Sequence, residues 1–320
     1  MIRVENLHKW YGSIQAVDDV SFSVDKGEVL GFIGPNGAGK STTMRMITGF
    51  IAPSRGKVLI DGIDMAENPI AAKSKIGYLP ENAPSYSSMT TFTFLKFAAE
   101  MRGFSGKERD KKVDEIVETC FLEPVLYQSV ETLSKGYTHR VCFAQSIIHD
   151  PEILILDEPT DGLDPNQKYE VRTLIKNMGE KKAIILSTHI LEEVDAVCSR
   201  LMTIDRGKIV ADGTPDSFRK RSETAGTVLL TINGESSNSI LENLEKLNDV
   251  EKTFVVSEED SDISVRIYPK NKADSDKFSS DIFNLVKEEK MNLVGLQIEK
   301  GRLEDVFRSI TLEDREEVKA

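Results

Sequence analysis

The sequence predicts an α/β domain built on a parallel sheet, with a helical segment inserted into it, followed by a smaller α+β domain. Two observations support this fold class. Short β-branched runs alternate with amphipathic runs of helical length through about residue 211, which is the order of elements in a parallel sheet covered by helices. The composition then changes after Gly213-Thr214-Pro215, and 320 residues are enough for about two domains of ordinary size.

The first domain is predicted to span residues 1–221. Between its second and third strands, residues 91–149 show no strand pattern, so a helical subdomain is expected over about residues 82–150. The expected strands are short apolar runs at 29–33, 76–79, 153–156, 183–186 and 201–204.

Two helices of the subdomain can be identified from their periodicity. Apolar residues three and four positions apart fall on one face of a helix, which is then expected to be buried. One such face carries Phe94, Leu95, Ala98 and Met101, and the other carries Val113, Ile116 and Val117.

The second domain is predicted to span residues 222–320 and to have a ferredoxin-like, split βαβ order of elements. A final amphipathic helix presents Leu303, Val306, Phe307 and Ile310 as one apolar stripe, which is expected to contact its own domain or, alternatively, a second copy. The expected order is strand 227–232, helix 239–247, strand 250–256, strand 263–268, helix 276–289 and strand 293–298.

Charge and hydropathy exclude several classes of protein. With 53 acidic and 41 basic side chains the formal net charge is −12, and acids outnumber bases by 22 to 14 in residues 221–320, so no nucleic-acid partner is expected. The longest apolar runs have four residues, against about 18 needed to cross a membrane, and the N-terminus lacks the apolar core of a secretory signal. A cytoplasmic location is therefore expected.

Cys120, Cys142 and Cys198 share no metal-binding or disulfide spacing and are expected to be buried apolar residues.

A glycine-rich loop follows the first expected strand. Residues 34–41 lie between strand 29–33 and a helix through Met44 and Ile47, which is the context of a phosphate-binding loop. Its glycines let backbone N–H groups approach phosphate oxygens, Lys40 adds a positive charge, and the Ser41 hydroxyl suits Mg²⁺. The predicted nucleotide-binding residues here are Gly34, Pro35, Asn36, Gly37, Ala38, Gly39, Lys40, Ser41 and Thr42.

Two adjacent acidic residues end the strand expected at 153–156. Carboxylates at the carboxyl end of a parallel strand are well placed for metal and phosphate chemistry. Asp157 is predicted to hold Mg²⁺, and Glu158 is predicted to take a proton from the water that attacks the γ-phosphate. A solvated turn is the alternative for an isolated acidic pair, but the glycine-rich loop upstream favours the site.

Further short motifs occur in a fixed order, and over residues 1 to about 215 the chain resembles the ATP-binding subunit of an ABC transporter. The motifs that carry this resemblance are Trp10-Tyr11-Gly12, the glycine-rich loop, Tyr78-Leu79-Pro80-Glu81, Leu133-Ser134-Lys135-Gly136-Tyr137, the run from Asp157 to Pro165, and Ser187-Thr188-His189. The resemblance implies a P-loop NTPase sheet domain with an inserted helical subdomain.

The resemblance also implies roles for individual residues. Tyr11 would stack on adenine, and His189 would donate to a γ-phosphate oxygen. Ser134, which also suits the N-cap of a helix, and Gly136 would contact the nucleotide held by a second protomer, with Asp164 in the loop beside them.

Two motifs depart from the family pattern. Glu81 occupies a position where most relatives have glutamine, and its carboxylate would lie near Mg²⁺ and the phosphates, as a catalytic and metal-contacting residue. Lys135 and Tyr137 replace the usual glycine and glutamine of the signature motif, whereas Ser134 and Gly136 are kept. These departures resemble the branch that serves antibiotic and lipid-type exporters and gliding-motility systems.

The expected function is an ATPase with ATP and Mg²⁺ as cofactors, active as a homodimer or with a paired ATPase chain. It would drive a separately encoded transmembrane permease, as an exporter, from the cytoplasmic face of the cell membrane, with the aromatic-rich segment 82–105 contacting the permease. One alternative is a mechanical ATPase of the DNA-repair kind, but only 93 residues separate Lys40 from Ser134, without sustained heptads. The other alternative is a regulatory module formed by the last hundred residues.

Overall fold

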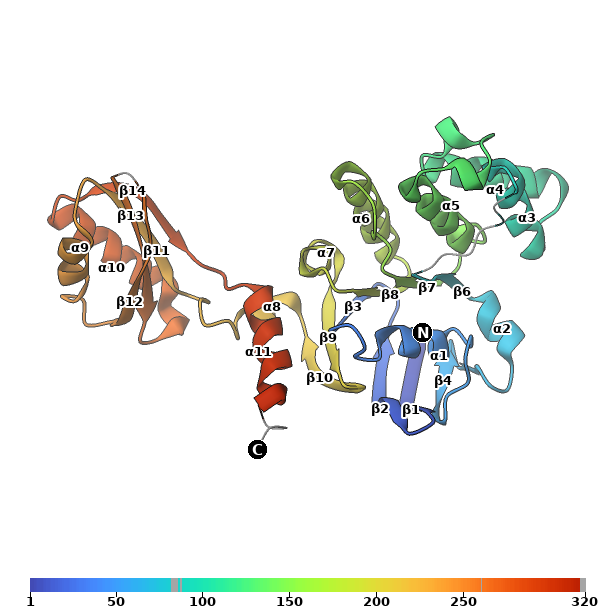
Figure 1. Ribbon diagram of the computed structural model, residues 1–320, viewed down its shortest axis with the longest axis horizontal. Helices are drawn as coiled ribbons and strands as arrows, with labels where there is room; N and C mark the ends of the chain where they lie inside the picture. Colours follow the sequence, from blue (N-terminus) through green and yellow to red (C-terminus); the bar gives the residue numbers. More distant parts are fainter. Residues whose placement is uncertain (82–85, 87, 260, 317–320) are drawn as a thin grey trace. The chain divides into compact units, whose positions relative to one another are not determined.

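The computed structural model describes residues 1–81, 86, 88–259 and 261–316 and shows two compact units (Figure 1). The first unit is Met1–Pro215 and the second is Asp216–Ala320, so the division lies a few residues before the boundary expected after residue 221. In the described residues, no helix is both long enough and apolar enough to span a membrane.

The main sheet of the first unit has the strand order β10-β9-β3-β8-β7-β6. Its strands pair in parallel from β9 to β6, while β10 is antiparallel to β9. All five strands expected from the sequence lie in this sheet, and that prediction is confirmed. The bounds are β3 Val29–Ile33, β6 Ile76–Leu79, β7 Ile153–Asp157, β8 Ala183–Thr188, β9 Arg200–Asp205 and β10 Lys208–Gly213.

A second sheet, with the order β2-β1-β4-β5, was not expected from the sequence. It is antiparallel, and the pairing of β1 with β2 shifts register three times, which disrupts the alternation of apolar and polar residues. A core of aliphatic and aromatic side chains from both sheets and α1 lies between them. The bounds are β1 Ile2–Tyr11, β2 Ile14–Val24, β4 Arg55–Ile60 and β5 Ile63–Asp64.

The helices of the first unit form two groups. In Figure 1, α3, α4 and α5 lie together as the inserted subdomain, while α1, α6 and α7 follow strands of the main sheet. The bounds are α1 Lys40–Ile47, α2 Pro69–Ser74, α3 Thr91–Met101, α4 Gly106–Thr119, α5 Lys135–Ile147, α6 Pro165–Gly179 and α7 Leu191–Val197, with short 3-10 turns at Glu123–Val125 and Val130–Thr132.

The two periodicities predicted for the subdomain are confirmed with one exception. The apolar residues of α4 are buried, as are Phe94, Leu95 and Ala98 of α3. Met101, the last residue of α3, is 71% exposed, contrary to expectation.

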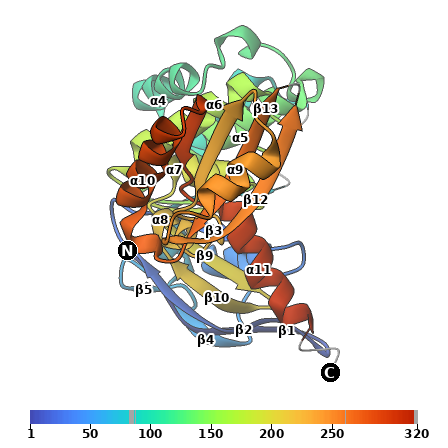
Figure 2. The same ribbon diagram turned by 90° about the vertical axis from the view of Figure 1, so that its left-hand side faces the viewer.

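The second unit has the predicted split βαβ order. Its sheet order is β12-β13-β11-β14, every neighbouring pair is antiparallel, and Figures 1 and 2 show α9 and α10 on the same face of it. Of the predicted apolar stripe on α11, Leu303 and Val306 are buried, whereas Phe307 and Ile310 are half-buried. The bounds are α8 Pro215–Arg219, β11 Val228–Asn233, α9 Ser237–Leu244, β12 Val250–Glu259, β13 Asp262–Pro269, a 3-10 turn at Lys272–Asp274, α10 Ser275–Glu288, β14 Asn292–Ile298 and α11 Leu303–Glu316.

Candidate functional site

The glycine-rich loop runs from the end of β3 to the start of α1, and two of its positions accept only glycine. A Cβ at Gly34 would lie 2.3 Å from the Ile204 carbonyl oxygen. A Cβ at Gly39 would lie 2.6 Å from the Ala16 carbonyl oxygen, and its φ is 109°. The loop is thereby held close to β2 and β9. All nine predicted loop residues, 34–42, lie between the end of β3 and the first turn of α1.

The N-terminus of α1 provides backbone donors for an anion. The first helical hydrogen bond runs from the Thr43 N–H to the Gly39 carbonyl at 2.9 Å. The N–H groups from Gly39 to Thr42 therefore precede the regular hydrogen bonding of the helix and need another acceptor. Such a group of N–H dipoles suits phosphate oxygens.

Lys40 is buried inside this loop. Its side-chain Nζ donates to the Gly34 carbonyl at 2.7 Å and to the Pro35 carbonyl at 3.2 Å. Burial lowers the pKa of Lys40, and nearby carboxylates, first Glu158 and then Asp157, act in the opposite direction. The ammonium group is therefore held beside the acidic residues at the end of β7.

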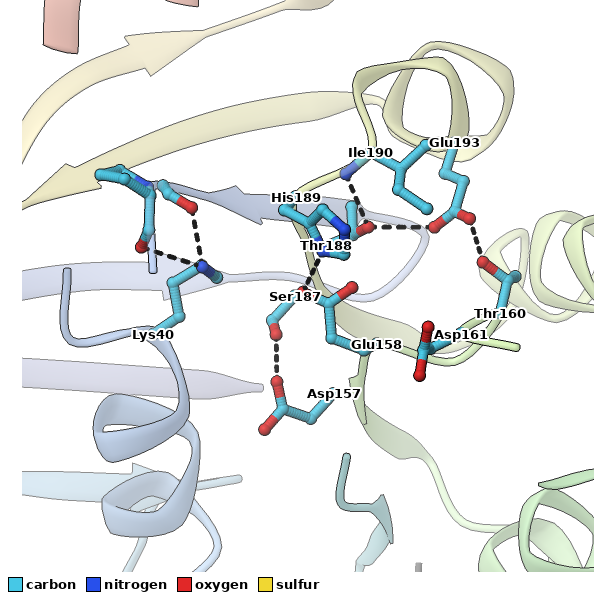
Figure 3. A network of polar contacts seen from close by, with 12 residues as sticks. Lys40, Asp157, Glu158, Thr160, Asp161, Ser187, Thr188, His189, Ile190 and Glu193 are labelled. Atoms are coloured by element: carbon cyan, nitrogen blue, oxygen red, sulfur yellow. Dashed lines mark hydrogen bonds and ion pairs between the residues drawn. The ribbon is translucent and has the colours of Figure 1, made fainter. Parts of the chain in front are cut away.

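Asp157 is the last residue of β7 and is only 2% exposed. The Ser187 hydroxyl of β8 donates to its Oδ1 (Figure 3). Because β7 and β8 are parallel neighbours with Asp157 opposite Ser187, the sheet register itself brings the two side chains together. Ser187 was not among the residues expected at the site, although it lies two positions before His189.

Glu158 and His189 form a hydrogen-bonded pair. His189 Nδ1 donates to Glu158 Oε1 at 2.9 Å, and the Glu158 N–H donates to the Ser187 carbonyl at 2.9 Å. The side chain of Glu158 is 12% exposed. Burial raises the pKa of Glu158, and the hydrogen bond from His189 acts in the opposite direction. This raised proton affinity suits a group that accepts a proton.

The residues present fit a magnesium ion that is shared with phosphates. Mg²⁺ is usually held by one or two carboxylates together with substrate phosphates, rather than by an all-protein cage. Asp157 supplies a buried carboxylate, and Ser41 supplies a hydroxyl in the first turn of α1. Within the described ranges, no group of three or more His, Cys, Asp or Glu residues could hold a metal alone. The donor set therefore suits a metal–nucleotide complex.

Glu81 lies two residues beyond the end of β6 and is exposed. Its carboxylate raises the pKa of Lys40, though less than Glu158 and Asp157 do, so it acts electrostatically on the same region. Tyr78 of β6 belongs to the same motif as Glu81, and no role was predicted for it from the sequence. Burial, followed by the charge of Asp157, raises the pKa of Tyr78 to about 12, so it stays neutral.

Ser134, Gly136 and Asp164 form a separate group at the N-termini of α5 and α6. Ser134 caps α5 by accepting from the Tyr137 N–H at 3.3 Å, and Asp164 caps α6 by accepting from the Gln167 N–H at 2.9 Å. A Cβ at Gly136 would lie 2.4 Å from the Gln167 side-chain oxygen, so the glycine lets the two helix ends approach. In the described part of the chain, no hydrogen bond or ion pair joins this group to Lys40 or Asp157.

Lys135, which departs from the usual glycine of the signature motif, has an ion-pair partner in the structure. Its ammonium group forms an ion pair with Asp161 at 2.7 Å, between exposed side chains, which links the start of α5 to the segment that follows Glu158.

Tyr11 lies at the end of β1, is 47% exposed, and has the Lys9 ammonium group 5.3 Å from its ring centre. An exposed aromatic face of this kind is available for stacking.

A buried carboxylate, Glu193 of α7, connects the loops on either side of the site and was also missed. It accepts hydrogen bonds from Thr160 and from Thr188, the latter at 3.0 Å. The available signal was an acidic residue four positions after His189, beside the apolar face formed by Val194 and Val197.

Comparison with known proteins gives one matching family profile and several relatives. The sequence profile described as "ABC transporter" matches residues 17–161. The chain is 32% identical to the linearmycin resistance ATP-binding protein of Bacillus subtilis over 97% of this chain and 98% of that protein. It is 35% identical to a probable multidrug ABC transporter ATP-binding protein of Escherichia coli, over 69% of this chain but only 38% of that longer protein.

Solved structures match about two thirds of the chain. The ATP-binding subunit of an ABC transporter superimposes with a TM-score of 0.64 at 32% identity, covering 69% of this chain and 92% of the other. A dimeric bacterial ABC transporter cassette superimposes with a TM-score of 0.63 at 25% identity, covering 67% of this chain and 98% of the other.

Proposed function

Because this chain belongs to the family of ABC transporter ATP-binding proteins, we propose that it hydrolyses MgATP at the site around Lys40 and Glu158 and thereby drives a separate transmembrane permease. One observation carries the proposal. The phosphate-binding loop with its buried Lys40 lies beside the Asp157–Glu158 pair, and Glu158 is hydrogen-bonded to His189 (Figure 3).

The proposed chemistry assigns one task to each group. The N–H groups at the start of α1 and the Lys40 ammonium group bind the β- and γ-phosphates. Mg²⁺, held by Ser41 and Asp157, would neutralise phosphate charge. Glu158 takes the proton of the attacking water as the bond from the γ-phosphorus to the bridging oxygen breaks, and the products are ADP and phosphate. His189 donates to the γ-phosphate, and Glu81 acts on the charge balance of the same region.

Two copies are proposed to share each nucleotide. Ser134, Gly136 and Asp164 would contact the ATP bound by the partner copy, because in one chain they form a group apart from Lys40. ATP then links the two chains, and hydrolysis releases them, so that closure is a population shift favoured by ATP. Tyr11 would stack on the adenine ring.

ABC transporter ATP-binding proteins act with a transmembrane partner, and we place this chain at the cytoplasmic face of a membrane as a peripheral subunit. Two of the relatives are described by resistance and multidrug functions, which supports an exporter. The permease-contacting segment expected at 82–105 falls partly outside the described residues. Within its described part, Tyr86 lies with its ring centre 5.3 Å from that of Phe97 and is 56% exposed.

Two measurements on the full chain test this function. Calorimetry with MgATP is expected to show binding that Lys40→Met abolishes, because the substitution keeps the length of the side chain but removes its charge. Purification from a mild detergent extract is expected to recover one multispanning protein with the chain. Absence of ATP binding contradicts the proposal, and ATP turnover without a membrane partner favours a soluble ATPase.

A further inference from the structure

Glu193 in α7 is buried, with an exposed fraction of 1%, although its side chain ends in a carboxyl group. Removing a carboxylate from water costs several kcal/mol unless hydrogen bonds and opposite charges compensate. An apolar residue would anchor α7 as well, because Val194 and Val197 beside it are buried. The packing of α7 therefore does not explain why a carboxyl group lies at this buried position.

The two oxygens of Glu193 accept hydrogen bonds from two different loops. Oε1 accepts from the hydroxyl of Thr160, which follows β7, and Oε2 accepts from the hydroxyl of Thr188, which ends β8, at 3.0 Å (Figure 3). The nearest cations, Lys168 and Arg172 of α6, are each 4.0 Å away. The closest contacts of the carboxylate are thus with the loops and not with the neighbouring helix.

Each of these loops carries one member of the Glu158–His189 pair. Thr160 lies two residues after Glu158 and is 2% exposed, so its hydroxyl has little access to water as an alternative partner. The Thr188 hydroxyl donates to Glu193 and also accepts from the Ile190 N–H at 3.0 Å. The backbone is therefore held on both sides of His189.

We propose that Glu193 is a positioning residue, which joins Thr160 to Thr188 and so keeps Glu158 and His189 within hydrogen-bonding distance of each other. We call these three residues, Glu193, Thr160 and Thr188, the Glu193 clamp. The inference rests on the proposed ATPase function. The clamp is not part of the loop around Lys40, so its loss is expected to reduce turnover without reducing nucleotide affinity.

Thr160→Val and Thr188→Val test the clamp, since each removes one hydroxyl and keeps a β-branched side chain. Each is expected to lower kcat by about 10- to 100-fold, as is typical when the support of a catalytic group is removed. The KM and the calorimetric Kd for MgATP are expected to stay within about twofold of wild type. Thr203→Val in β9 is the matched control, because Thr203 is fully buried and its hydroxyl has no hydrogen-bond partner among the described residues. Its kcat is expected to match wild type.

A second comparison separates positioning from general stability. In a His189→Ala background, Thr188→Val is expected to have no additional effect on the residual rate, because the clamp acts through the Glu158–His189 pair. A full additional loss in that background, or a kcat for both threonine variants equal to that of Thr203→Val, would overturn the inference.

Glu193→Gln provides an independent variant if a threonine variant fails to fold, since it keeps the side-chain shape while removing the charge and one acceptor. Its kcat is expected to fall over the same range, and a wild-type kcat would contradict the clamp. A wild-type protein without MgATP turnover would contradict the proposed function itself. Normal wild-type turnover that is undiminished in the variants would contradict only the clamp.

Discussion

Glu158 has a φ of 52°, which is uncommon for a residue with a Cβ atom. Such a conformation costs about 1–3 kcal/mol and persists only where surrounding contacts hold it. Here the Glu158 N–H donates to the Ser187 carbonyl, and its carboxylate accepts from His189. The strained backbone turns the carboxylate of Glu158 out of the line of β7, toward the loop after β8.

At the residue scale, Glu158→Gln is expected to leave MgATP affinity unchanged and to lower kcat by at least about 100-fold. The amide keeps the shape of the side chain but cannot accept a proton from water. Steady-state phosphate release and calorimetry measure the two quantities. Glu192→Gln in α7 is the control, because the side chain of Glu192 is 78% exposed and pairs only with Arg172 in the described residues. A Glu158→Gln variant with near-normal turnover would remove Glu158 from the role of base.

At the element scale, the C-terminal end of α5 packs closely on β6. A Cβ at Gly77 in β6 would lie 2.3 Å from the Ser146 carbonyl oxygen of α5. His149, just after α5, donates from Nε2 to the Ile76 carbonyl at 3.1 Å. Its Nδ1 is buried and has no hydrogen-bond partner in the described ranges. This junction connects the inserted subdomain to the edge of the main sheet.

Gly77→Ala is expected to destabilise the first unit by about 1–3 kcal/mol, because backbone atoms must move to admit the new methyl group. Urea unfolding can be followed by the fluorescence of Trp10, the single tryptophan, which lies in β1 of that unit. Gly136→Ala is the contrast, since the nearest atom there is the side-chain oxygen of Gln167, which can swing away. Equal stability of Gly77→Ala and wild type would contradict the close packing.

His149 predicts a pH dependence of stability. Burial, followed by the charge of Arg102, lowers the pKa of His149 from 6.5 to about 4. Between these two values the unfolded chain binds more protons than the folded one, so this group reduces stability as the pH falls from 6.5 to about 4 and adds no further loss below that. His149→Gln can keep the hydrogen bond to Ile76 but does not titrate.

The variant His149→Gln is therefore expected to lose less unfolding free energy than wild type between pH 6.5 and pH 4.5, as measured by urea unfolding at both values. Because the other titrating groups are common to both proteins, the difference between the two losses isolates His149. Parallel losses in the two proteins would show that the histidine is not buried as a neutral group.

At the scale of the whole molecule, the residues with predicted nucleotide contacts form two groups on different elements. One group surrounds Lys40, and the other lies at the N-termini of α5 and α6, where Ser134 is exposed. An exposed helix N-terminus with a serine cap favours a negative charge. A second copy that brings its own γ-phosphate to this end would complete the site.

Full-length Glu158→Gln with MgATP is accordingly expected to elute as a dimer in size-exclusion chromatography with light scattering. Adding Ser134→Glu is expected to return it to a monomer, because the new carboxylate would repel the γ-phosphate of the partner. Ser105→Glu, at the exposed N-cap of α4, introduces the same charge at another helix N-terminus and is expected to leave the dimer intact. A dimer that survives Ser134→Glu would contradict the shared site.

Much of the nucleotide site could be predicted because its chemistry is local in sequence. The glycine-rich loop joins one strand to one helix, and Asp157 and Glu158 directly follow a buried strand, so each motif lies within a few residues. The second sheet of the first unit escaped prediction because its register shifts break the two-residue alternation of burial. Met101 was expected to be buried because periodicity does not show which turns of a helix the rest of the fold covers.

The sequence by itself therefore determined the α/β class, the phosphate loop and the acidic pair, since these depend on spacing along one element and the turn after it. Only the tertiary structure decided that Ser187 contacts Asp157, that Glu158 meets His189, and that Glu193 joins the loops after β7 and β8. Except for the contact between Thr188 and Glu193, which are five positions apart, these contacts join residues about 30 positions apart. They arise because parallel strands bring their carboxyl ends to one edge of the sheet, an alignment that no local pattern encodes.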